Sequence, residues 1–202
     1  LFPYAPRTGA QPAFRLLHVG HLNHVKDQRT LLKSFQLMSR RIDCHLRIVG
    51  EGALDHELQR LVRELGIERH VTFLGFVRHD LLAPHFAWAD LLMHTSVYEG
   101  QGVVFAEAAA SGLPVCGTRV GLLADLGSSF AETVPPGDHE ALADAAVSLL
   151  GDSSRMHSLK CSARAWAAVH TASWSAARFA DVYQSCIERH ADCGGGAESH
   201  DV

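Results

Sequence analysis

The sequence lacks the features that mark membrane-spanning and nucleic-acid-binding proteins. No apolar run approaches the roughly 20 residues that a membrane span needs, and no signal peptide is visible at the start. The sequence also lacks an excess of positive charge, because its formal net charge is −4 with the histidines neutral. We therefore expect no transmembrane segment, and we do not expect nucleic acid as a partner.

Several motifs of common enzymes are absent as well. There is no Gly-x4-Gly-Lys-Ser/Thr loop for phosphate, no Gly-x-Ser-x-Gly nucleophile elbow and no Asp-x-Asp to anchor a metal-bound diphosphate. The segment 50–55 begins like a dinucleotide-binding fingerprint, but its sixth residue is Asp55 rather than glycine. The 14 histidines form no His-Glu-x-x-His pattern, so the local motifs imply no metal and no cofactor.

Disulfide bonds are not expected, because the five cysteines are an odd number without close pairs. This arrangement favours reduced thiols in a cytoplasmic setting over a disulfide framework or a zinc site. Hydrophobic residues make up 47% of the chain and charged residues 20%, as in ordinary globular proteins. A chain of 202 residues can bury a full core as one domain.

Short apolar runs alternate with helical apolar patterns from Phe14 onward, which predicts an α/β fold. The alternation implies a doubly wound, mostly parallel sheet with helices on both faces, followed by C-terminal helices. Residues 1–13 hold three prolines and are expected to be a linker or the remnant of a missing N-terminal domain. Residues 14–190 are expected to form the domain, and residues 191–202 a disordered tail. The expected strands cover residues 14–19, 45–49, 71–74, an apolar run within 89–96, 115–118 and a short segment near 133–134.

The stretch 89–117 is the most informative part of the chain. An apolar run ends in a loop with Gly100 and Gly102, and the alanine-rich segment 103–111 follows as an expected buried helix. Gly112 is placed to end that helix. Strand, glycine loop, helix and strand form a βαβ unit, and such units bind ligands where the helix begins.

Two glutamates, Glu99 in this loop and Glu107 on the helix, are candidate ligand-binding residues. Glu107 lies among alanines and Phe105, and an unpaired buried carboxylate is costly. The hydroxyls of a sugar diol could supply the donors that it needs. The alternatives are that Glu107 binds a neighbouring arginine or a backbone N–H, and that Glu99 is a solvated loop residue.

The run from Tyr98 through Glu99, Gly102 and Glu107 to Gly112 resembles the Glu-x7-Glu motif of retaining glycosyltransferases with the two-domain GT-B fold, of the group 1 or family four type. The resemblance extends from Leu16 to about Tyr183. It implies that the chain is the Rossmann-like, C-terminal half of such an enzyme, which binds a nucleoside-diphosphate sugar.

The resemblance also implies roles for particular residues. Lys26, with Gly20 and His21, would bind the donor diphosphate, and Glu107 would accept hydrogen bonds from the ribose hydroxyls.

Glu99 would face the donor sugar and phosphates, with Gly100, Gln101, Gly102 and Val103 beside it. The base would lie against the turn formed by Gly75, Phe76 and Val77. Lys26 is one of only three lysines in the sequence, and its alternative is a solvated lysine at a helix start.

The chain departs from the family pattern at two positions. His21 stands where the family carries an arginine, and a neutral imidazole gives one donor where a guanidinium gives a charged fork. Leu122 follows Gly121 where the family favours two glycines, so it would narrow the space near the donor sugar or shift the loop. Both differences leave the fold prediction intact but leave sugar choice and full catalytic competence open.

The function that the resemblance implies is transfer of a sugar from a nucleoside diphosphate to an acceptor with retained anomeric configuration. The acceptor, a sugar, lipid or other small molecule, is not indicated, and the resemblance implies an N-terminal acceptor domain that we expect to be missing from this chain. We therefore expect the chain alone to bind nucleotide but to turn over little or no sugar. A cytoplasmic location is expected, with peripheral membrane attachment through the missing domain left open. The alternatives are a sugar-nucleotide epimerase or phosphorylase of the same fold and a non-catalytic binding or partner-regulating module.

Overall fold

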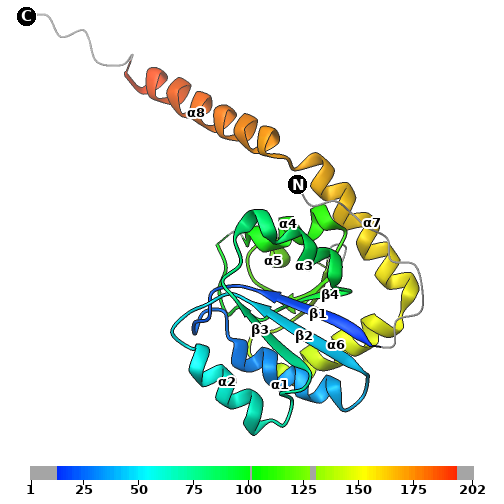
Figure 1. The fold of residues 1–202 in the computed structure, drawn as a ribbon. Coiled ribbons are helices and arrows are strands. Elements are labelled where there is room, and N and C mark those ends of the chain that lie inside the picture. The colour runs from blue at the N-terminus through cyan, green and yellow to red at the C-terminus, as the bar shows by residue number, and fades with distance from the viewer. Residues whose placement is uncertain (1–12, 101, 128–130, 195–202) are drawn as a thin grey trace, which may run out of the picture. The chain divides into compact units, whose positions relative to one another are not determined.

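Six parallel strands form one sheet in the order β3-β2-β1-β4-β5-β6 (Figure 1). The structure is a computed structural model that describes residues 13–100, 102–127 and 131–194. The chain order reverses between β1 and β4, which pair with each other at Leu16 and Leu91. In a doubly wound sheet, this reversal opens a crevice at the carboxyl ends of the strands. The strands are β1 (Phe14–Val19), β2 (Cys44–Val49), β3 (Val71–Gly75), β4 (Leu91–His94), β5 (Val115–Thr118) and β6 (Ala131–Val134).

Helices cover both faces of this sheet, as the alternation in the sequence predicts. Helices α1, α2 and α6 lie on one face, and α3, α4 and α5 lie on the other (Figure 1). Their bounds are α1 (Gln28–Ser39), α2 (Asp55–Glu64), the 3-10 helix η1 (His79–Leu81), α3 (Ala83–Trp88), α4 (Val103–Ser111), α5 (Leu122–Leu126), α6 (His139–Gly151), α7 (Ser153–Val169) and α8 (Ala172–Gly194). None of the helices within the described ranges combines the length and the hydropathy of a membrane span.

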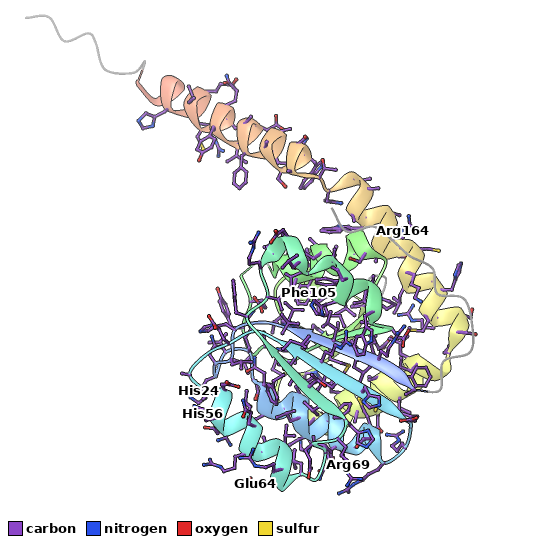
Figure 2. The ribbon with its side chains drawn as sticks, in the orientation of Figure 1. His24, His56, Glu64, Arg69, Phe105 and Arg164 are labelled. Atoms are coloured by element: carbon purple, nitrogen blue, oxygen red, sulfur yellow. The ribbon has the colours of Figure 1, made fainter. Side chains whose placement is uncertain are left out.

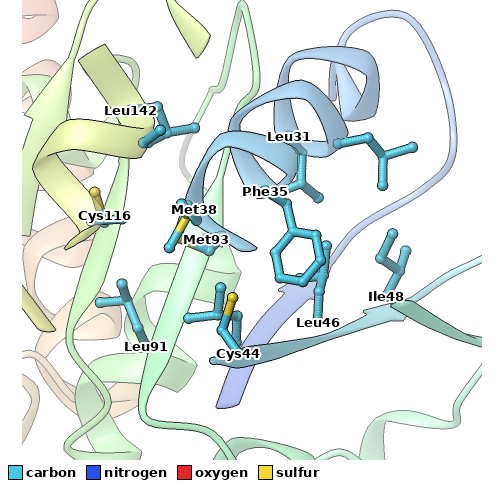
Figure 3. Close-up of a cluster of buried hydrophobic side chains, with 14 of the residues drawn as sticks. Leu31, Phe35, Met38, Cys44, Leu46, Ile48, Leu91, Met93, Cys116 and Leu142 are labelled. Carbon is cyan, nitrogen blue, oxygen red and sulfur yellow. The ribbon is translucent and has the colours of Figure 1, made fainter. Parts of the chain in front are cut away.

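The hydrophobic core lies between the sheet and the helices. The α1 side chains Leu31, Phe35 and Met38 recur at helical spacing and are fully buried against β2 residues such as Leu46 and Ile48 (Figure 3). The four cysteines whose side chains the structure describes are free thiols, and two of them, Cys44 and Cys116, belong to this core. Burial, followed by the nearby Asp43, raises the pKa of the Cys44 thiol to about 12.

Several element ends coincide with the sequence predictions because local chemistry determines them. Strand β1 and helix α4 have the expected bounds. Gly112 ends α4 in a left-handed conformation with a φ of 64°. The Asp138 side chain accepts a hydrogen bond from Ala141 N at the start of α6, as an N-cap does. Strand β6 begins at Ala131, before the expected 133–134.

The chain divides into two compact units, residues 1–165 and residues 166–202. The second unit holds the end of α7 and the whole of α8, which continues to Gly194. Within it, the His170 ring stacks on Trp166 and meets the edge of Trp174, each at a centroid distance of 4.5 Å. Most of residues 1–13 and residues 195–202 lie outside the described part, so the expected linker and tail remain predictions.

Candidate functional site

The loops that follow β1, β4 and β5 are bonded to one another at the carboxyl edge of the sheet. Thr95 Oγ1 donates to the backbone oxygen of Lys26 at 2.8 Å, and Val97 N donates to Val25 O at 2.8 Å. Thr118 Oγ1 donates to Ser96 O at 2.6 Å. The first two bonds fix the loop that carries Lys26 against the loop that carries Glu99, and the third ties the Glu99 loop to Thr118, the last residue of β5.

The loop after β2 approaches the loop between β1 and α1, residues 20–27, which we call the first loop. The approach is backbone to backbone. A Cβ added to Gly50, whose φ is 137°, would lie 1.9 Å from Gly20 O. A Cβ on Gly52 would lie 2.3 Å from Leu22 O. Glycine is therefore required at both positions, and the contact holds the first loop at a defined height above the sheet.

Three side chains converge on one oxygen of Glu99. Lys26 Nζ donates to Oε1, Ser96 Oγ donates to the same atom at 2.8 Å, and His94 Nε2 lies 3.2 Å from it. The Glu99 side chain is only 10% exposed, so Glu99 is not the solvated loop residue of the alternative interpretation. Burial alone would raise the pKa of Glu99, but the contacts with His94, Lys26 and Ser96 outweigh it and lower the pKa to about 2.

Two buried histidines that sequence reasoning did not single out support this cluster: His94, which is part of it, and His18, whose ring stacks on His94. Burial, more than the neighbouring His94, lowers the pKa of His18 to about 3. The neutral His18 ring donates from Nδ1 to Met93 O at 3.1 Å and accepts from Gln28 Nε2 at 3.2 Å. Burial also lowers the pKa of His94, and its Nε2 has no hydrogen bond of good geometry among the described residues.

The start of α4 and the loop after β5 pack against the same cluster. Gly102 precedes α4 with a φ of 71°, and a Cβ there would lie 2.4 Å from the Phe105 ring. Phe105 meets the His94 ring edge-on at a centroid distance of 4.5 Å. A Cβ on Gly121 would lie 2.8 Å from the Cβ of Glu99. Leu122, which departs from the family pattern, begins α5 directly after this contact.

A cavity of about 290 Å³ opens beside the first loop. Its lining includes four of the residues that the sequence pointed to: Gly20, His21, Phe76 and Val77, together with Val19, Val49, Gly50, Glu51 and Leu82. A Cβ added to Gly20 would lie 3.5 Å from Lys26 Cδ. The Lys26 stem therefore runs past the wall of this cavity.

Glu107 lies on α4 and is buried to 9% exposure. Its Oε1 is 2.7 Å from Nε2 of His79, which is two residues beyond the cavity residue Val77 in the sequence. The partner is thus a histidine that is itself 67% exposed, rather than the arginine or backbone N–H of the alternative interpretation. The carboxylate reaches the surface beside the segment that lines the cavity.

The remaining candidate residues lie around this arrangement. Gly75 has a φ of 66°, and neither it nor Gly100 has a described atom within 4 Å of an added Cβ. Val103, at the start of α4, is 64% exposed. Gln101 lies outside the described residues.

Residues 13–152 match the family described as glycosyl transferases, group 1. The chain belongs to this family. It is 33% identical over 139 residues to N-acetyl-alpha-D-glucosaminyl L-malate synthase of Bacillus anthracis. The matched segments make up 68% of this chain and 36% of that protein. It is 34% identical over 170 residues to a GDP-mannose-dependent alpha-(1-6)-phosphatidylinositol monomannoside mannosyltransferase of Mycobacterium tuberculosis. That match covers 77% of this chain and 43% of the mannosyltransferase. The chain therefore spans less than half the length of these relatives.

Solved structures share the fold of this chain. Anabaena HepE in complex with UDP superposes with a TM-score of 0.76 at 25% identity, over 86% of this chain and 49% of that one. The C-terminal domain of a group 1 family protein, LpcC from Francisella tularensis, has a TM-score of 0.72 at 19% identity. That superposition covers 79% of this chain and 87% of the LpcC domain. The sheet with its flanking helices is thus the Rossmann-like, C-terminal half of a GT-B fold.

Proposed function

We propose that this glycosyltransferase domain binds the nucleoside-diphosphate sugar in an enzyme that transfers the sugar with retention of configuration. The observation that carries the proposal is the convergence of Lys26, Glu99 and the start of α4 at the carboxyl ends of β1 and β4. A cavity of about 290 Å³ adjoins them, and it is close to the lower limit for a small-molecule site. HepE, which shares the fold, was solved in complex with UDP.

The order of the groups along the site suggests how the donor lies. The base would occupy the cavity against Phe76 and Val77, and the ribose hydroxyls would bind Glu107 in exchange for, or beside, His79. The diphosphate would then reach Lys26 and the backbone amides at the start of α4, where the helix dipole favours an anion. As the sugar leaves, these groups and His21 would stabilise the negative charge that develops on the diphosphate.

The protonation state of Glu99 limits its role. Because its pKa is held at about 2, Glu99 is an anion at neutral pH and accepts hydrogen bonds without having a proton to give. We propose that it accepts from the hydroxyls of the donor sugar. Ser96 Oγ also donates a hydrogen bond to Glu99 Oε1, so the Glu99 side chain would keep its position when Lys26 turns toward the diphosphate.

A calorimetric titration with UDP, GDP and ADP tests this proposal. We expect one diphosphate to bind the chain, and both Lys26→Met and Glu107→Gln to weaken it. Lys33→Met, which removes an exposed lysine on α1, serves as the matched control and should leave the affinity unchanged. Equal affinity in Lys26→Met and Lys33→Met would refute the diphosphate role of Lys26.

A second candidate function follows from His21. The family carries an arginine there, and His21 is exposed at the cavity, so the domain could be a nucleotide-binding module without turnover. In that case His21→Arg should raise diphosphate affinity sharply.

We expect the 202-residue chain by itself to transfer little or no sugar, and steady transfer by the purified chain would contradict this. Product analysis would also reveal an epimerase or phosphorylase, which would change its ligand without an added acceptor.

A further inference from the structure

A cluster of three metal-ligating side chains lies at the amino ends of β2 and β3, opposite the loops of the donor site. Asp43, His45 and His70 each offer a ligand atom, and these atoms lie within 4.8 Å of one another. Figure 2 labels Arg69, the residue before His70, at this end of the sheet, and labels His24 of the first loop at the other end. None of the three side chains takes part in the proposed binding of nucleotide.

The parallel pairing of β2 and β3 brings these residues together. Asp43 and His45 are two residues apart and therefore point to the same side of the chain, while Cys44 between them enters the core. His70 immediately precedes Val71, the partner of Leu46 in the register, and Leu46 N donates to His70 O at 2.8 Å. The imidazole centroids of His45 and His70 are 5.4 Å apart.

The chemistry of the cluster suits a divalent metal of intermediate softness. Two imidazoles and one carboxylate form a ligand set that binds Zn²⁺ and leaves a fourth position open. His70 Nδ1 is shielded from solvent and has no hydrogen-bond partner in the described part of the chain. A shielded polar atom of this kind is costly until a proton donor or a metal satisfies it.

Two arginines on the strands beside the cluster are engaged elsewhere. Arg15 pairs with His45 in the register of β1 and β2, and Arg47 is two residues further along β2. Both guanidinium groups lie over the ring of Trp88, at 5.4 Å and 3.8 Å from its centroid. Asp43 supplies the negative charge that a cation between two neutral imidazoles favours.

We propose that Asp43, His45 and His70 form a Zn²⁺ site that ties the edge strand β3 to β2. A tetrahedral zinc site places its ligand atoms about 3.3 Å apart, given metal–ligand bonds of about 2.0–2.1 Å. Each side chain therefore has to move inward by about 1 Å or less from the 4.8 Å spacing. Asp43 and His45 are exposed, so rotation about their side-chain bonds is not hindered by a packed core.

The experiment is a zinc competition titration against a chromophoric chelator, with the whole chain first freed of metal by EDTA. We compare the wild-type chain with His45→Ala, His70→Ala and Asp43→Asn. The control is His157→Ala, because His157 Nε2 lies 3.5 Å from Cys161 Sγ and is the obvious competing site. Unfolding in EDTA shows whether each variant keeps its fold, and unfolding with and without Zn²⁺ measures the stabilisation.

One zinc ion per wild-type chain is expected, with the affinity reduced at least roughly tenfold in the three site variants, as is common when a metal site is altered. The control should bind as the wild type does, and added zinc should raise the unfolding midpoint of both. Absence of a one-to-one site, or a loss of affinity in His157→Ala but not in His45→Ala, would overturn the proposal. If His70→Ala does not fold, the two variants of exposed residues decide the question.

Discussion

The contact between Gly102 and the Phe105 ring leads to a quantitative prediction about the loop that begins α4. In Gly102→Ala, the new Cβ would lie 2.4 Å from a ring carbon of Phe105, a side chain with no exposed surface. The φ of 71° at this position is also left-handed, which costs an alanine about 1–2 kcal/mol. Gly66→Ala is a matched control, because Gly66 has a φ of 68° and no described atom within 4 Å of an added Cβ.

The two variants share the backbone cost and differ in the contact. Overpacking a core typically costs a further 1–3 kcal/mol or so, so we expect Gly102→Ala to lose about 2–5 kcal/mol of unfolding free energy. The backbone term alone predicts a loss of about 1–2 kcal/mol for Gly66→Ala. Urea unfolding measures both values, provided that the denaturant slope m is unchanged between the variants.

The same substitution should also disturb the site. A displaced Phe105 ring presses on His94, whose Nε2 is 3.2 Å from the Glu99 carboxylate. Gly102→Ala is therefore expected to weaken diphosphate binding, while Gly66→Ala is not. Equal destabilisation by the two substitutions would refute the argued packing of Phe105 against the loop, and unchanged diphosphate affinity would refute its link to Glu99.

Three further predictions follow from other contacts. Gly50→Ala should lower the unfolding free energy in urea more than Gly75→Ala, because the new Cβ at residue 50 would lie 1.9 Å from Gly20 O. The new Cβ at residue 75 would meet no described atom within 4 Å, so equal losses in the two variants would contradict the close approach of the loops. The pKa of His18 is about 3 when folded and 6.5 without the fold, so the unfolded chain binds the proton first and stability should fall as the pH drops from 6.5 toward 3. The slope from this group is at most about 1.4 kcal/mol per pH unit, and His18→Gln should show a shallower slope between pH 7 and pH 5. Iodoacetamide should label the exposed Cys161 in the native chain but Cys44 only after unfolding, as peptide mass spectrometry would show.

Features that depend on local sequence could be predicted without the structure. The bounds of β1 and α4, the glycine that ends α4 and the Asp138 cap follow from periodicity and capping chemistry alone. The family also followed from the sequence, because the two glutamates lie in one short segment with a recognisable context. Glu99 and Lys26 were each named from that resemblance.

Features that depend on distant segments could not be predicted. His79, the partner of Glu107, lies 28 residues away, and spacing alone gave no reason to choose it over an arginine. His18 and His94 could have been noticed as histidines at the ends of apolar strands, but their mutual contact requires β1 and β4 to pair. The cluster of Asp43, His45 and His70 likewise exists only because β2 and β3 are neighbours.

The most direct test of the central claim is a crystal structure of the chain with the nucleoside diphosphate that the titration selects. We predict that the diphosphate lies within hydrogen-bond distance of Lys26 Nζ and the amides at the start of α4. The ribose should contact Glu107, and the base should occupy the cavity beside Phe76. A nucleotide bound away from the carboxyl ends of β1 and β4, with Lys26 contacting only Glu99, would contradict the proposed donor site.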